Sequence, residues 1–159
     1  MDLSLKGMRA LVCGSSQGIG KEIAIELANE GVEVLLIARN EEKLNSVLNE
    51  LSKKNNQNHS YIVADFENES DSKNKIEKFT SDNKIKIDIL INNSGGPPPG
   101  KITDAKISDF EKYMKMHLHC SHLLTQLFLP NMKKNRYGRI INIISISVKS
   151  PINNLGVSN

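Results

Sequence analysis

Short apolar runs alternate along this chain with longer stretches whose apolar residues recur at helical spacing, as is typical of an α/β protein. Five runs predict strands, at residues 10–12, 32–38, 61–63, 87–91 and 139–144. Amphipathic stripes predict helices between them, such as Ile19, Ile23, Leu27 and Ala28 after the first run and Leu44, Leu48 and Leu51 after the second. Since strands joined by helices run parallel and their crossovers are right-handed, the pattern predicts a doubly wound parallel sheet with helices on both faces.

Several residues mark where these helices are expected to begin and end. Asn40 is a good N-cap for the second helix, and Ser108-x-x-Glu111 predicts a capping box that opens a long fourth helix. Pro130 is expected to kink or end that helix, because proline removes a backbone donor. Residues 68–82 are highly polar and predict a short exposed helix.

Composition limits the class of protein. The chain has 159 residues, the size of one domain, so residues 1–159 are expected to form a single one. Its net charge of +3 is mild and its lysines are scattered, which argues against a nucleic-acid surface. No apolar run approaches the roughly 18 residues of a membrane span, and the N-terminus lacks a signal-peptide layout, so a cytoplasmic protein without membrane contact is expected. Cys13 and Cys120 are too few for a disulfide framework and are expected to be reduced and buried.

The most informative segment is glycine-rich and lies directly between the first predicted strand and the first predicted helix. It contains Gly14, Ser15, Ser16, Gln17, Gly18, Ile19 and Gly20. Glycines there permit close approach of the backbone, and a helix N-terminus offers free N–H groups and a positive dipole end to a pyrophosphate. The segment therefore predicts a dinucleotide phosphate site, with a plain tight turn as the alternative.

The Gly-x-x-x-Gly-x-Gly spacing resembles the glycine motif of the short-chain dehydrogenase/reductase family, with Cys13 where threonine is usual. The resemblance continues through Asp65 after the third strand, through Asn92-Asn93-Ser94-Gly95, where the family has Asn-Asn-Ala-Gly, and through Gly138 to Ile143 at the fifth strand. It implies a Rossmann fold and an oxidoreductase that acts on a small carbonyl or alcohol substrate, similar to 3-oxoacyl-carrier-protein reductases. It also implies further cofactor contacts from Asp65, Phe66, Asn93, Ser94 and Gly95, and a homo-oligomer for a chain of full family length.

The end of the second strand indicates which nicotinamide cofactor is bound. NAD is selected by an acidic residue there and NADP by an arginine that accommodates the 2′-phosphate. This chain has Arg39 and no acid at that position. A planar guanidinium suits a phosphate, so NADP is predicted, with Arg39 as a solvated surface residue as the alternative.

The family's catalytic residues map only in part onto this chain. The serine that orients the carbonyl oxygen falls on Ser145, with Ser147 close in register, and the asparagine of the proton relay falls on His117. The tyrosine that protonates the alkoxide falls on Ser158, a far weaker acid than a phenol of pKa ~10. The lysine would lie beyond residue 159, so the resemblance implies C-terminal truncation, and Tyr113 and Tyr137 match no motif.

Three further features carry alternatives. The run His117–His122 shows no tetrahedral ligand set, so no metal site is predicted. The segment 95–100, rich in proline and glycine, is either a wall beside the nicotinamide or a simple connector. Two functions stay open: an NADP-dependent oxidoreductase, and a non-catalytic nucleotide-binding fragment that lacks the proton donor. Truncation would also leave the fifth strand as an edge with partly uncovered isoleucines.

Overall fold

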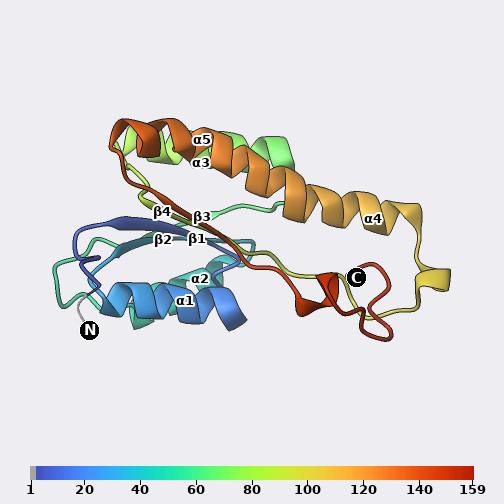
Figure 1. Ribbon diagram of the computed structural model, residues 1–159. Coiled ribbons are helices and arrows are strands. Elements are labelled where there is room, and N and C mark those ends of the chain that lie inside the picture. Colours follow the sequence, from blue (N-terminus) through green and yellow to red (C-terminus); the bar gives the residue numbers. More distant parts are fainter. Residues whose placement is uncertain (1–2) are drawn as a thin grey trace.

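The computed structural model describes residues 3–159, which form a five-stranded parallel sheet between two layers of helices (Figure 1). The strands are β1 (Arg9–Cys13), β2 (Glu33–Ala38), β3 (Ser60–Val63), β4 (Ile89–Asn92) and β5 (Arg139–Asn142). Their spatial order is β3-β2-β1-β4-β5, and every neighbouring pair is parallel. All five predicted strands are confirmed. The order reverses between β1 and β4, so the carboxyl ends of these two strands border the crevice where such sheets bind ligands.

The helices divide between the two faces of the sheet, which confirms the doubly wound topology. In Figure 1, α1 (Gly18–Asn29) and α2 (Glu41–Glu50) cover one face. The other face carries α3 (Glu69–Asp82) and α5 (Cys120–Lys134). A π-helical turn, η2 (Lys115–His119), joins α5 to α4 (Ile107–Met114), which extends past the end of the sheet in Figure 1. Two short 3-10 turns, η1 (Ile102–Asp104) and η3 (Ile146–Val148), lie in the connections after β4 and β5.

Alternating side chains of the central strands supply a separate core on each face. In β1, Leu11 packs among the helices α3 and α5, whereas Ala10 and Val12 pack against α1 and α2. All three are fully buried, because a parallel strand at the centre of a sheet has helices on both sides. Cys13 and Cys120 are free and buried, as predicted.

The polar segment before β4 is less exposed than its sequence predicts. The helix there is α3, 14 residues long, and Ile76 on its inner face is completely buried. Asn68 caps it by accepting a hydrogen bond from the Asp71 N–H at 3.2 Å. Ser72 and Ile76 are buried against the sheet and Phe79 packs on the same core, so the predicted helix is confirmed with its polar residues exposed and its inner face docked on the sheet.

The start and end of the long fourth helix also differ from the prediction. The helix begins at Ile107, and the Asp109 carboxylate accepts a hydrogen bond from the Lys106 N–H at 3.1 Å, so the capping box at Ser108 is not formed. Pro130 lies inside α5, which continues to Lys134. Met132 is buried and holds this last turn against the sheet.

β5 is an edge strand of the sheet, as predicted. Ile141 is 47% exposed and Ile144, just after the strand, is 72% exposed. The chain then returns beside the segment after β4, where the Gly100 N–H donates to the Asn154 carbonyl at 2.6 Å (Figure 1). No helix within residues 3–159 is both long and apolar enough to cross a membrane.

Candidate functional site

The glycine segment leaves β1 and enters α1 through two residues in the left-handed region of φ. Gly14 has a φ of +58° and Gly18 a φ of +57°, conformations that glycine adopts at little cost. Gln17 is the N-cap of α1 and makes no capping hydrogen bond with its side chain. The first turn of α1 therefore presents backbone N–H groups and the positive end of the helix dipole at the carboxyl edge of the sheet, which suits an anion.

Asn93, directly after β4, holds this glycine loop from the side. Its Nδ2 donates to the carbonyl oxygens of Cys13, at 3.2 Å, and Gly14, at 3.4 Å. A Cβ on Gly14 would lie 2.8 Å from the same Nδ2, closer than a carbon can approach, whereas a Cβ on Gly20 would clash first with the Gly14 carbonyl oxygen. Gly14 is thus required by the packing of Asn93, and Gly20 by its close approach to the Gly14 backbone. By contrast, a Cβ on Gly18 would meet no atom within 4 Å.

One further residue of the loop, Ser15, has a role that the sequence did not indicate. Ser15 is fully buried, and its Oγ accepts a hydrogen bond from the Ile37 N–H at 3.0 Å, so its side chain ties the loop to β2. Burial raises the pKa of the Cys13 thiol to about 12, and this thiol stays protonated at neutral pH. Ile19, in contrast, is 61% exposed on the open side of the loop.

Arg39 lies at the carboxyl end of β2, beside the glycine loop, and its side chain is 63% exposed. Its Nη1 lies 3.3 Å from Oε1 of Glu67, and that carboxylate also pairs with Lys112 at 2.7 Å. The hydrogen bond from Lys112 lowers the pKa of Glu67. A phosphate could replace the Glu67 carboxylate beside the Arg39 guanidinium, because an ion pair exposed to water is weak.

Lys43 is a second cation in this region that sequence reasoning missed. Its Nζ donates to Gln17 Oε1 at 2.7 Å, which links the first turn of α2 to the glycine loop. The signal that could have identified it is its position four residues after Arg39, at the start of a helix that Asn40 caps.

Asp65 and Phe66 lie between β3 and α3 and shape the turn there. Asp65 Oδ1 accepts a hydrogen bond from the Glu67 N–H at 3.0 Å, and its carbonyl oxygen accepts one from Ser72 Oγ at 2.7 Å. Phe66 is buried, and its carbonyl oxygen accepts a hydrogen bond from Cys120 Sγ at 3.5 Å. The turn is therefore anchored to both α3 and α5.

His117 approaches the segment after β4 from η2. Its Nδ1 lies 2.8 Å from Ser94 Oγ, and its ring centroid lies 6.1 Å from that of Tyr113. Burial lowers the pKa of His117, and the backbone of Gly95 partly offsets this effect. The structure thus brings together His117, Ser94 and Gly95, three residues predicted for the site.

Ser145 and Ser158 lie on the C-terminal segment, and each forms a hydrogen bond with Ser147. Ser145 Oγ accepts a hydrogen bond from the Ser147 N–H at 3.1 Å, and the buried Ser147 Oγ donates to the Ser158 carbonyl at 3.3 Å. Within residues 3–159, no hydrogen bond joins either serine to His117, and no three His, Cys, Asp or Glu side chains are grouped as metal ligands.

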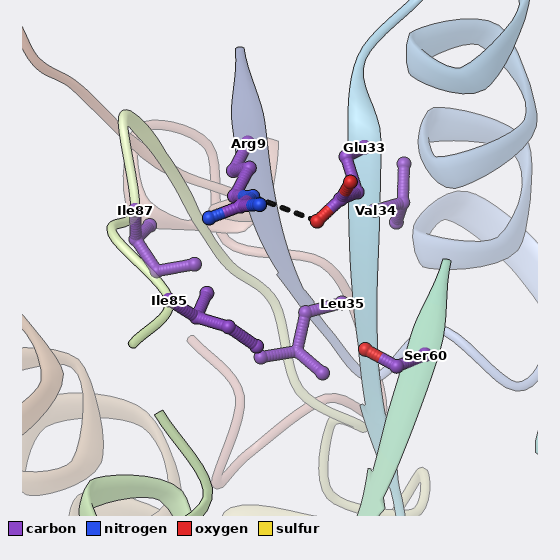
Figure 2. Close-up of a pocket in the computed structure, with 7 residues that line it drawn as sticks. All are labelled: Arg9, Glu33, Val34, Leu35, Ser60, Ile85 and Ile87. Atoms are coloured by element: carbon purple, nitrogen blue, oxygen red, sulfur yellow. Dashed lines mark hydrogen bonds and ion pairs between the residues drawn. The ribbon is translucent and has the colours of Figure 1, made fainter. Parts of the chain in front are cut away.

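The sheet also has a small cavity at its opposite edge, near the amino ends of β1, β2 and β3 (Figure 2). Its walls include Arg9, whose Nε lies 2.7 Å from Oε1 of Glu33, together with Leu35, Ser60 and Ile87. The cavity measures about 10 Å³, barely the volume that one water molecule needs. It has no room for a nucleotide.

Residues 8–157 match the model of the short chain dehydrogenase family. This chain belongs to that family. It is 33% identical over 152 residues to the uncharacterized oxidoreductase YvaG of Bacillus subtilis, covering 95% of this chain and 56% of that protein. It is 35% identical over 144 residues to the 3-oxoacyl-[acyl-carrier-protein] reductase FabG of Rickettsia felis, covering 91% and 56%. The chain thus spans about half the length of the curated relatives it matches.

Solved structures show the same fold. L-sorbose reductase from Gluconobacter frateurii, complexed with NADPH and L-sorbose, superposes with a TM-score of 0.92 at 26% identity, over 100% of this chain and 60% of that one. A metagenomic short-chain oxidoreductase in complex with NADP gives a TM-score of 0.84 at 30% identity, over 97% and 69%. Structural relatives of this family member therefore bind NADP(H).

Proposed function

We propose that this chain is the nucleotide-binding part of an NADP(H)-dependent oxidoreductase that transfers hydride to or from a small carbonyl or alcohol. The observation that carries the proposal is the carboxyl edge of the sheet, where the glycine loop, the open first turn of α1 and the Arg39 guanidinium lie side by side. The loop and the helix N-terminus suit the pyrophosphate of a dinucleotide, and the guanidinium suits the 2′-phosphate that distinguishes NADP. The relatives crystallised with NADPH and NADP support the same cofactor.

The residues present fit the phosphates of NADP. The pyrophosphate would be held by backbone N–H groups around Ser16 and Gly18, and a Cβ on Gly18 would meet no atom within 4 Å. The 2′-phosphate would be held by Arg39, with Lys43 as a second cation nearby. Asp65 and Phe66 would border the adenine, and Asn93, Ser94 and Gly95 the nicotinamide side. Bound NADPH supplies the hydride, and this chain positions it.

The catalytic half of the site is less complete. We propose that Ser145 orients the substrate oxygen and that His117 is a polar group beside it. Ser158 cannot replace a phenol as proton donor, because an alkyl hydroxyl is far less acidic. We therefore expect residues 1–159 alone to bind NADPH but not to oxidise it when an acetoacetyl thioester is added. This substrate is tested first because one relative is a 3-oxoacyl-[acyl-carrier-protein] reductase. Robust turnover would contradict this expectation.

A non-catalytic nucleotide-binding fragment is the second candidate function. It is favoured by Ser158, whose carbonyl rather than its hydroxyl makes the hydrogen bond to Ser147. We propose that a protein of full family length is a homo-oligomer with the activity, and that residues 1–159 retain the cofactor step. Reading the coding sequence beyond Asn159 separates the two candidates: a continuing frame with a tyrosine and lysine supports the enzyme, and a stop codon supports the fragment.

Cofactor choice is tested by titrating NADPH and NADH into the wild-type chain and Arg39→Asp. A charged hydrogen bond to phosphate contributes about 1.5–3 kcal/mol, so Arg39→Asp should weaken NADPH binding by about tenfold or more and leave NADH binding unchanged or stronger. Lys133→Asp, on the last turn of α5, carries the same charge change away from the site and is the matched control. Equal NADPH affinity in wild type and Arg39→Asp would refute the assignment.

A further inference from the structure

One nitrogen of His117 is buried without a partner. Nδ1 is close to Ser94 Oγ, at 2.8 Å, whereas Nε2 is shielded from solvent and bonds no group of the described chain. Buried polar atoms in native proteins are nearly always hydrogen-bonded, so an unpaired one calls for an explanation such as an unfilled ligand contact. The remaining question is what fixes the ring and what Nε2 faces.

The backbone fixes His117 from both sides. The residue is the middle one of η2, the π-helical turn that joins α4 to α5, and such turns are frequent at functional sites. Met116, directly before it, is buried, and Cys120 is buried at the start of α5 with its Sγ bonded to the Phe66 carbonyl. These two anchors leave the turn little freedom, so the imidazole is directed at the segment after β4.

That segment is itself fixed against the glycine loop. Ser94 follows Asn93, whose amide bonds the carbonyls of Cys13 and Gly14. The pair of Ser94 and His117 therefore borders the same edge of the sheet as the phosphate site. Ser94 and His117 are also the two positions at which this chain departs from the alanine and asparagine that its resemblance implies. An alanine at position 94 could not hydrogen-bond the imidazole, so the serine at 94 and the histidine at 117 are explained by their contact with each other.

We propose that Ser94 is a positioning residue for His117: its hydroxyl holds the ring in one orientation, so that Nε2 becomes a hydrogen-bonding atom for the nicotinamide half of the bound nucleotide. This inference rests on the proposed function. A serine hydroxyl can donate to Nδ1 or accept from Nδ1–H, so it holds the ring in place in either tautomer and lets Nε2 act as donor or acceptor. Without Ser94, Nδ1 would also lose its partner and the ring would be free to rotate.

The test uses the whole chain labelled with ¹⁵N-histidine. The ring ¹⁵N resonances of His117 report its tautomer and its pKa directly. In the wild type we expect the Nδ1 resonance of a hydrogen-bonded nitrogen and a pKa below 6.5, and NADPH should shift the Nε2 resonance. In Ser94→Ala we expect a shifted Nδ1 resonance, a changed pKa and an NADPH affinity lower by about two- to tenfold, the value of one neutral hydrogen bond.

Two controls accompany these measurements. Ser94→Thr keeps a hydroxyl and should retain the Nδ1 resonance and the affinity, and His119→Asn changes an exposed histidine of the same turn and should alter neither. Unchanged His117 ring resonances in Ser94→Ala would overturn the positioning role. If the ring resonances change in Ser94→Ala but the Nε2 resonance of the wild type does not respond to NADPH, the pair is only a structural contact and the proposal is overturned. If the wild type fails to bind NADPH at all, the proposed function fails, and the resonances of Ser94→Ala still test the pair.

Discussion

Gly14 and Gly18 form a matched pair for testing how the glycine loop is held. Both have nearly the same left-handed φ, +58° and +57°. They differ in their surroundings: a Cβ on Gly14 would lie 2.8 Å from Asn93 Nδ2 and 2.9 Å from the Asn93 carbonyl oxygen, whereas a Cβ on Gly18 would meet nothing within 4 Å. Substitution by alanine thus adds backbone strain in both variants and a steric clash in only one.

The two costs can be separated in magnitude. A non-glycine residue in the left-handed region costs about 1–2 kcal/mol, which both variants share. Forcing an extra carbon into a packed site costs about 1–3 kcal/mol more, and only Gly14→Ala incurs this cost. Gly14→Ala should therefore lose about 2–5 kcal/mol of unfolding free energy and Gly18→Ala about 1–2 kcal/mol, a large difference for a domain whose total stability is about 5–15 kcal/mol.

Urea unfolding followed by far-UV circular dichroism measures this difference. With a slope of about 1–3 kcal/mol per molar urea, the two midpoints should differ by about 1 M. Among folded molecules, Gly18→Ala should bind NADPH more weakly than Gly14→Ala, because the phosphates are proposed to lie in the open space at Gly18. Equal urea midpoints for the two variants would refute the role of Asn93 in holding the loop.

Three other changes test the fold and its edge. His59→Phe should lower the free energy of unfolding by about 1–3 kcal/mol in a urea titration, because the Val34 N–H and the Ser52 carbonyl, bonded to the ring at 3.0 and 2.9 Å, lose their partner; an unchanged midpoint would contradict this. Ile144→Lys should reduce self-association in analytical ultracentrifugation, because Ile144 is 72% exposed beside the open edge strand, and identical profiles would argue against that edge. Burial lowers the pKa of His117 below its ordinary value of 6.5, so His117 binds fewer protons in the folded chain than in the unfolded one at pH values below 6.5. The free energy of unfolding should therefore decrease as the pH falls below 6.5. Urea midpoints at pH 7 and pH 5 should differ less in His117→Asn, and an equal difference would exclude His117 as a source of the pH dependence.

Much of the fold could be predicted because its signals are local. Apolar runs mark buried parallel strands wherever helices cover both faces, and Asn40 accepts the capping hydrogen bond from the Lys43 N–H that its position predicts. The capping box at Ser108 failed for a local reason as well. Asp109 is a competing acid one residue along, and it bonds the Lys106 N–H instead, so the helix starts earlier than the Ser-x-x-Glu pattern indicates.

The candidate site was less predictable, because its contacts join residues distant in the chain. Ser15 was predicted to contact the cofactor from its place in the glycine motif, and only the structure shows that its hydroxyl is bonded to β2. The π-helical turn at His117 leaves no periodic trace in the sequence. It depends on anchors at Met116 and Cys120, and the second of these involves Phe66, far earlier in the chain.

These long-range contacts form one continuous path along the carboxyl edge of the sheet. The glycine loop is bonded to Asn93, the next residue is Ser94, and Ser94 is bonded to His117 in the turn between α4 and α5. The loop proposed to hold the phosphates and the histidine proposed to face the nicotinamide are therefore fixed by adjacent residues of one segment after β4. A segment fixed at both ends by hydrogen bonds sets the distance between the two halves of a bound dinucleotide. For this reason Gly14 matters beyond its own loop: a side chain there would displace Asn93, and with it the partner of His117.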